Sequence, residues 1–191
     1  MSTINSSYTT QNDLLLKNLM VFYKTENNDN LDKMLKIITG ESKISLRIVD
    51  WFATNYAKKN YTLYPIHTTN GDVIRFKVYF DYKLKLKAYS KKRFDPFCRW
   101  DRISIPYKND TSIETTIGQL NFFKWAIENE VINYIEEYYE TIEKDMNSRN
   151  STSKRKETIE NSKTRKKREE LSISATKSIK KEEVEIVVQF N

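Results

Sequence analysis

The chain has 191 residues, enough for one domain, and carries 33 Lys and Arg against 26 Asp and Glu, for a net charge of +7. Its single His and single Cys exclude a His/Cys zinc cluster and a disulfide within one chain, and its three isolated Gly exclude a Gly-rich phosphate loop. We therefore expect a protein that is not an enzyme and has no catalytic residue, metal or cofactor; an enzyme with a carboxylate-bound Mg²⁺ is the third-ranked alternative.

The N-terminal part predicts a short tail followed by helices. Residues 1–12 are polar, lack the basic and apolar regions of a signal peptide, and predict a disordered tail. Apolar residues at helical spacing predict helices at 13–24, 31–38 and 45–59, which open a core expected to span residues 13–146. No stretch approaches the roughly 20 apolar residues of a membrane span, so we expect no membrane partner.

Residues 61–88 predict a long β-hairpin. Asn70–Gly71 is a strong signal for a type I′ turn, and a two-residue loop there pairs His67 with Ile74. Over 74–88 apolar and polar residues alternate strictly, which predicts a strand of about 50 Å with a bend near its middle. The face expected to point to the core holds Tyr61, Leu63, Ile74, Phe76 and Val78.

A short strand at 102–107 and a long helix at 116–146 are predicted next, the helix with a capping box of Thr116 and Gln119. The outer face of this helix is acidic, with Glu128, Glu130, Glu136, Glu137, Glu140, Glu143 and Asp145. Alternation returns in 169–191 and predicts a C-terminal strand pair that joins the core sheet. The expected fold class is α+β, with an antiparallel sheet led by a long hairpin, N-terminal helices, one long amphipathic helix and a disordered basic loop.

The basic run 147–168 accounts for the whole excess of positive charge. It holds nine Lys or Arg and two Glu and so nets +7, as the chain does. Because strands are predicted after it, we expect a long disordered loop held at both ends. Such a run is typical of a polyanion contact, a nuclear-localisation signal or an inert linker. A further alternative is that it docks on the acidic helix of the same or another copy.

A second basic block, 75–102, follows the predicted hairpin and nets +7 from ten basic and three acidic residues. Its polar face predicts a nucleic-acid interface in which Lys and Arg contact phosphates and Tyr rings stack on bases. The candidate residues are Tyr64, Arg75, Lys77, Tyr79, Lys83, Lys85, Lys87, Lys91, Lys92 and Arg93, joined by Lys154, Arg155, Lys156, Arg165, Lys166, Lys167 and Arg168 of the basic run. The alternative is a solvated, Lys-rich strand face that discourages edge-to-edge aggregation.

Three segments carry a family resemblance. They read FKVYFDYKLKLKAYSKKRFDPFCR, TTIGQLNFFKWAIENEVINYIEEYYETIEKDMN and RKKREELSISATKSIKKEEVEIVVQF. Together they resemble a group of uncharacterised proteins from nucleocytoplasmic large DNA viruses, the giant viruses of protists, over most of residues 45–191. The resemblance implies a viral setting, in a virus factory of the host cytoplasm or in the virion, and assigns no role to any residue. A localisation signal in the basic run would add the host nucleus.

The preferred function is a non-enzymatic nucleic-acid-binding protein of a large DNA virus, with DNA and RNA both open as partners. The alternative is a structural or assembly protein of the virion, which associates with itself or with other virion proteins through segregated charge. The two differ in whether the basic face is free or covered by the acidic helix.

Overall fold

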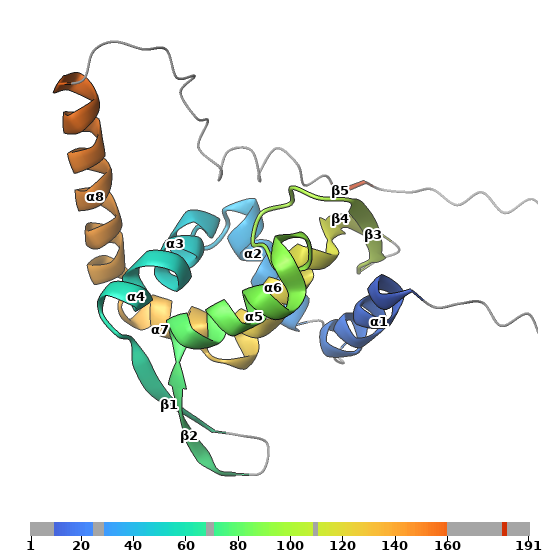
Figure 1. The fold of residues 1–191 in the computed structure, drawn as a ribbon. Coiled ribbons are helices and arrows are strands. Elements are labelled where there is room, and N and C mark those ends of the chain that lie inside the picture. Colours follow the sequence, from blue (N-terminus) through green and yellow to red (C-terminus); the bar gives the residue numbers. More distant parts are fainter. Residues whose placement is uncertain (1–9, 25–28, 68–70, 109–110, 160–180, 183–191) are drawn as a thin grey trace, which may run out of the picture.

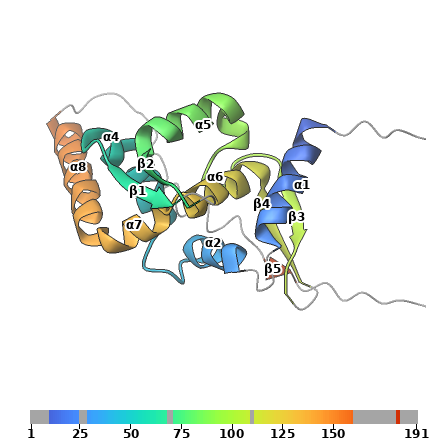
Figure 2. The same cartoon turned by 90° about the horizontal axis from the view of Figure 1, so that it is seen from below.

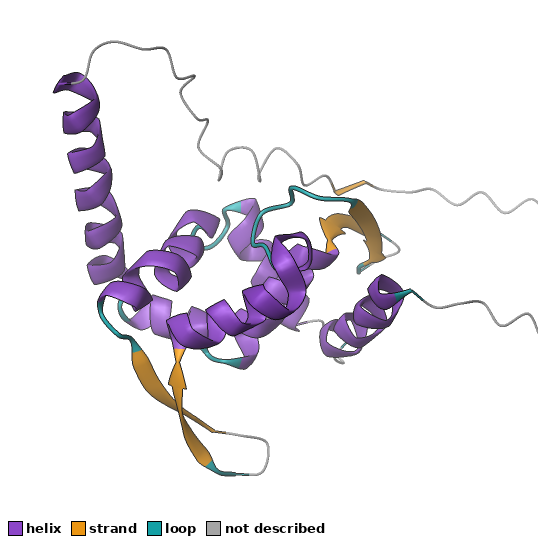
Figure 3. Ribbon diagram, in the orientation of Figure 1, coloured by secondary structure: helices purple, strands orange, loops and turns teal. Residues whose placement is uncertain are grey.

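The computed structural model describes residues 10–24, 29–67, 71–108, 111–159 and 181–182. Figure 3 shows a mainly helical molecule with a β1–β2 sheet and a β3–β4–β5 sheet, both antiparallel. The α+β class predicted from the sequence is confirmed. In Figures 1 and 2, helices α1 and α8 lie toward opposite ends of the molecule.

The N-terminal helices agree closely with their predicted positions. Helix α1 spans Gln11–Tyr23, so it begins inside the predicted tail 1–12, and residues 1–9 lie outside the described part. Helix α2 spans Asp29–Thr39. The predicted helix 45–59 consists of α3 (Leu46–Trp51), a π-helical turn η1 (Phe52–Tyr56) and α4 (Ala57–Lys59).

The hairpin forms, but its predicted pairing is wrong by one residue. Strands β1 (Leu63–His67) and β2 (Val73–Lys77) pair Ile66 with Ile74 and Tyr64 with Phe76. Five residues separate the strand ends instead of two, and every cross-strand partner is shifted. The type I′ turn predicted at Asn70–Gly71 involves residues 68–70, which lie outside the described part. Phe76 and Val78 are buried as predicted, whereas Tyr61, Leu63 and Ile74 are exposed. Tyr64 now shares the inner face of the hairpin with Phe76.

The predicted long strand 74–88 ends at Lys77, and the chain continues as helix α5 (Val78–Arg93). Ser90, with φ 60° and ψ 168°, marks a kink near the end of α5. Along the straight part of this helix, residues four apart share a face and residues two apart point in nearly opposite directions. A sequence in which every second residue is apolar therefore places apolar side chains on two opposite sides of the helix. Val78 and Tyr82 face the core, and Phe80 and Leu84 face outward.

The second sheet holds β3 (Arg102–Pro106), β4 (Ser112–Thr116) and β5 (Lys181–Glu182). Strand β3 confirms the strand predicted at 102–107. Strand β5 pairs with β4 and is the described fragment of the region 169–191, where a strand pair is predicted; the rest of that region lies outside the described residues.

The predicted helix 116–146 is three helices, α6 (Ile117–Glu128), α7 (Val131–Glu137) and α8 (Tyr139–Ile159). The break after α6 falls at Glu130, whose φ of 55° is left-handed, and Tyr138 ends α7. Helix α8 continues into the basic run, so residues 147–159 are helical rather than a loop, and 160–168 lie outside the described part.

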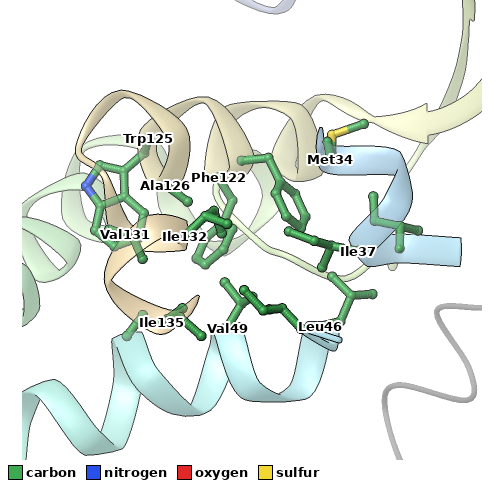
Figure 4. Packing of buried hydrophobic residues seen from close by; sticks show 14 of the residues in the cluster. Met34, Ile37, Leu46, Val49, Phe122, Trp125, Ala126, Val131, Ile132 and Ile135 are labelled. Atoms are coloured by element: carbon green, nitrogen blue, oxygen red, sulfur yellow. The ribbon is translucent and has the colours of Figure 1, made fainter. Parts of the chain in front are cut away.

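Helix α6 lies at the centre of the core. In Figure 2 it runs between α5 and α2, and Figure 4 shows Phe122, Trp125 and Ala126 of α6 packed in the buried cluster. Gly118, the second residue of this helix, lies close to the last turn of α5, because a Cβ there would be 2.8 Å from the carbonyl oxygen of Lys92. The start of α6 therefore depends on a residue without a side chain.

A cluster of three charged residues, the buried Asp95, the half-buried Asp50 and the exposed Arg99, joins α3 to the segment after α5. The Arg99 guanidinium donates to both carboxylate oxygens of Asp95, with Nε–Oδ2 at 2.9 Å and an Nη–Oδ1 distance of 2.6 Å. Burial, followed by the charge of Asp95, raises the pKa of Asp50 to about 6. Asp50 is therefore ionised at neutral pH, and its ionisation lowers the free energy of unfolding.

The raised pKa of Asp50 predicts that the free energy of unfolding increases as the pH falls from 7 to 5. The reason is that the folded state binds a proton on Asp50 below about pH 6, whereas the unfolded chain binds it only near pH 3.8. Asp50→Asn should remove most of this rise, leaving the part due to Asp95, whose pKa burial also raises. It should also stabilise the protein at pH 7 by about 1–2 kcal/mol. Urea denaturation at several pH values measures both effects. Asp72→Asn, an exposed control in the hairpin loop, should keep the rise; its loss in that control would contradict the assignment.

Candidate nucleic-acid interface

The solvent-facing side of α5 carries both basic and apolar residues. We call Phe80, Lys83, Leu84 and Lys87 the α5 outer face. Phe80 is 64% and Leu84 50% exposed, and both lysines are exposed. Spacings of three and four residues place these side chains together on one side of the helix. The opposite side of α5 packs against α6, where Tyr82 lies beside Trp125.

The hairpin adds two cations next to this face. Arg75 and Lys77 lie on β2, opposite Pro65 and Leu63 of β1, and both are exposed. Lys77 is also the residue from which α5 begins. Figure 1 shows the hairpin projecting from the body of the molecule at this end of α5. The cations of β2 and α5 therefore follow one another along a continuous part of the chain.

These cations lack ion-pair partners within the described part of the chain. No salt bridge joins Arg75, Lys77, Lys83 or Lys87 to a described acid. Elsewhere several cations are paired, as in the bridges from Lys59 to Asp145, Lys92 to Asp101, Arg99 to Asp95, Arg102 to Glu114, Lys108 to Asp32 and Lys124 to Glu128. Asp81, the acid within α5, accepts a hydrogen bond from the Trp125 indole at 2.7 Å. The outer side of β2 and α5 therefore presents positive charge to solvent.

The two predicted stacking tyrosines are not exposed platforms. The Tyr64 hydroxyl donates to the backbone oxygen of Asn129 at 2.8 Å, and its ring stacks on Tyr134 with centroids 4.9 Å apart. Burial also raises the pKa of Tyr64. Tyr79 is half-buried, with the Lys58 ammonium 5.7 Å from its ring centroid. The expected exposure of Tyr64 is wrong, because the true hairpin register turns it inward.

Phe80 is the exposed ring beside the lysines. The strand predicted over 74–88 would instead place it on the same face as Phe76 and Val78, toward the core. The signal that could have found it is the spacing of Phe80, Leu84 and Ala88, which fits a second stripe of a helix as well as it fits a strand. In a strand this stripe and the inward stripe of Val78 and Tyr82 would share one face; they lie on different sides only because α5 is a helix.

The remaining predicted residues are divided among several places. Lys85 is half-buried on the inner side of α5, and Lys91 is exposed beyond the kink. Lys92 pairs with Asp101 at 2.7 Å. Arg93 donates to side-chain oxygens of α1, with Nε 2.8 Å from Asn12. Lys154, Arg155 and Lys156 belong to α8 but their side chains lie outside the described part, as do Arg165, Lys166, Lys167 and Arg168 altogether.

The acidic residues lie on other helices. Glu130, Glu136, Glu137 and Glu140 are exposed around α7 and the start of α8, and none forms a salt bridge with a described cation. In Figure 2, α5 and α7 lie on different sides of α6. The acidic helices therefore leave the α5 outer face uncovered.

The described residues contain no group of three or more His, Cys, Asp or Glu that could hold a metal ion. No helix in the described ranges is long and apolar enough to cross a membrane.

Comparison with known proteins places the chain in a family. Residues 1–190 match DUF7197, a family of unknown function. The chain belongs to this family. It is also similar to uncharacterised protein L507 of Acanthamoeba polyphaga mimivirus, with 45% identity over 163 residues. The match covers 83% of this chain and 61% of that relative's length. The giant-virus resemblance is thereby confirmed. No solved structure matches the chain.

Proposed function

We propose that this protein binds single-stranded nucleic acid without catalysing a reaction, and that the α5 outer face with Arg75 and Lys77 is the contact surface. The observation that carries the proposal is an exposed Phe80 among cations that have no acidic partner in the described structure. A Phe ring with neighbouring lysines supplies the two contacts that bind single strands without reading their sequence, base stacking and phosphate neutralisation.

The physical basis of binding is the release of counterions. Each Lys or Arg that neutralises a phosphate releases condensed cations, so the affinity should fall as the salt concentration rises. Phe80 would stack on a base, because every base offers a π face whatever its sequence. The basic run 147–168 would add phosphate contacts. A giant-virus protein with these properties would act on nucleic acid in the virus factory of the host cytoplasm or inside the virion.

Removing two cations from the α5 outer face should weaken binding and reduce its salt dependence. Lys83→Gln with Lys87→Gln removes two phosphate contacts, so the slope of log K against log salt should become less steep by about 1.4 for a single strand. Fluorescence anisotropy with a labelled single strand across a salt series measures the slope.

The matched control for that experiment is Lys33→Gln with Lys36→Gln. These lysines are exposed on α2, which lies on the other side of α6 in Figure 2, and the control removes the same charge. It should leave the slope near the wild-type value. Equal changes in both double variants would mean that net charge alone, and no particular face, governs binding.

Phe80→Ala should weaken single-strand binding by about 1–3 kcal/mol, because one stacked base loses its platform. Leu84→Ala is the control, since Leu84 is a similarly exposed apolar residue one turn away and has no ring. It should have little effect on affinity, and duplex binding should change less than single-strand binding in the Phe80 variant. Equal losses in the two variants would show apolar contact rather than stacking.

Virion assembly is the second candidate function, and one observation favours it. The exposed acids around α7 and the exposed cations of α5 lie on different sides of one molecule, so copies could join head to tail through opposite charges. Light scattering at low salt separates the two candidates. A larger mass in wild type that the double variant Lys83→Gln with Lys87→Gln abolishes, together with an unchanged single-strand affinity of that variant, would favour assembly.

A further inference from the structure

A pocket of about 250 Å³ lies between α1, α5 and α6, on the side of α5 away from the outer face. Helix α1 is held in place by Arg93, which donates to the side-chain oxygens of Asn12 at 2.8 Å and Gln11 at 3.1 Å. The pocket lies just below the range of roughly 300–1,000 Å³ that is typical of sites for drug-sized ligands. It therefore suits a ligand at the small end of that range.

The pocket contains a cation without an acidic partner in the described structure. Lys85 is half-buried in the lining and forms no salt bridge with a described residue. Lys124 and the acid Glu128 also line the pocket, but they pair with each other, and the Lys124 ammonium lies 5.0 Å from the centroid of the Phe22 ring. A half-buried ammonium is partly desolvated, and an anionic group on a ligand offsets this cost. Lys85 thus gives the pocket a preference for an anion.

Two asparagines in the lining present unused acceptors. The Asn121 side chain is oriented by its amide nitrogen, which donates to the Arg93 carbonyl at 2.9 Å, and the residue is only 6% exposed. The Asn129 amide nitrogen likewise donates to the Trp125 carbonyl at 2.8 Å. Neither amide oxygen has a hydrogen-bond donor among the residues that the structure describes. Asn121 is buried and Asn129 is half-buried. An acceptor on a buried residue is costly unless it is satisfied, so N–H groups of a ligand fit here.

The other walls are aromatic. Tyr89 and Trp125 line the pocket, and their rings are fixed by the core, since each packs against Phe94 with centroid distances of 6.3 and 5.6 Å. Fixed rings of this kind favour a flat, partly apolar ligand. The lining therefore combines an aromatic wall, two acceptors and one unpaired cation.

The geometry points to a binding site for a mononucleotide whose base carries an amino group. Its phosphate would pair with Lys85, its amino group would donate to Asn121 and Asn129, and its base would lie along the aromatic wall. Lys85 is about 200° around the helix from both Lys83 and Lys87. This site and the α5 outer face are therefore separate, and either can fail without the other.

Calorimetric titration of the whole protein with cytidine 5′-monophosphate, cytidine and inorganic phosphate tests the site. The mononucleotide should bind at least about tenfold more tightly than either of its parts, because only it uses the cation and the acceptors together. Lys85→Gln should weaken mononucleotide binding about tenfold. Lys87→Gln, the same charge change on the outer face, should leave it unchanged, and so should the double variant Lys83→Gln with Lys87→Gln.

A second variant tests the pocket without altering its polar groups. Leu15 lines the pocket from α1, and Leu15→Trp should fill it and abolish mononucleotide binding while circular dichroism stays that of wild type. The inference is overturned if the mononucleotide does not bind below about 10 mM. It is also overturned if phosphate alone binds equally well, or if Lys85→Gln and Lys87→Gln have equal effects. If the wild-type protein binds the mononucleotide but no single strand, the proposed role of the outer face fails and this inference stands.

Discussion

The packing of α5 on Trp125 is the constraint on which the rest of the structure depends. The indole N–H donates to Asp81 at 2.7 Å, and the ring lies 6.0 Å from Tyr82 and 6.4 Å from Phe76, measured between centroids. Asp81 and Tyr82 are adjacent residues, and in a strand they would point to opposite faces of the sheet. Both can reach one indole because the chain turns into a helix directly after β2. The buried tryptophan of α6 thus favours a helix where the alternating sequence favours a strand.

The helical winding of α5 determines what the molecule shows to solvent. A sequence that alternates with period two cannot keep all its apolar residues on one side of a helix, and so Phe80 and Leu84 point outward at 64% and 50% exposure. The same winding places Lys83 and Lys87 beside them and turns Lys85 inward, toward the pocket under α1. Exposed apolar side chains that lie together on one helix can form part of a binding surface. The proposed outer face and the proposed pocket are therefore two results of one packing arrangement.

Local signals in the sequence were sufficient for the α+β class, the N-terminal helices and β3. They were insufficient for elements whose conformation depends on contacts between residues far apart in the sequence. Leu, Lys and Ala, which dominate 83–88, are good helix formers, so their alternation was weaker evidence for a strand than it looked. The hairpin register depended on a loop longer than the Asn70–Gly71 signal implies, and the break at Glu130 has no Gly or Pro to mark it. The sequence alone located the basic block of the candidate site. The candidate stacking residue could be identified only from the structure, in which Tyr64 packs against Tyr134 and Phe80 is exposed to solvent.

Backbone NMR of the isotope-labelled protein, free and with a short single strand, tests the central claim most directly. Residues 78–89 should show helical carbon chemical shifts, and the largest amide changes on binding should fall on Lys77, Phe80, Lys83 and Lys87. Extended-strand shifts in this segment would contradict the account of the fold. Binding changes centred on Lys33 and Lys36 of α2, with none on the outer face, would contradict the account of the function.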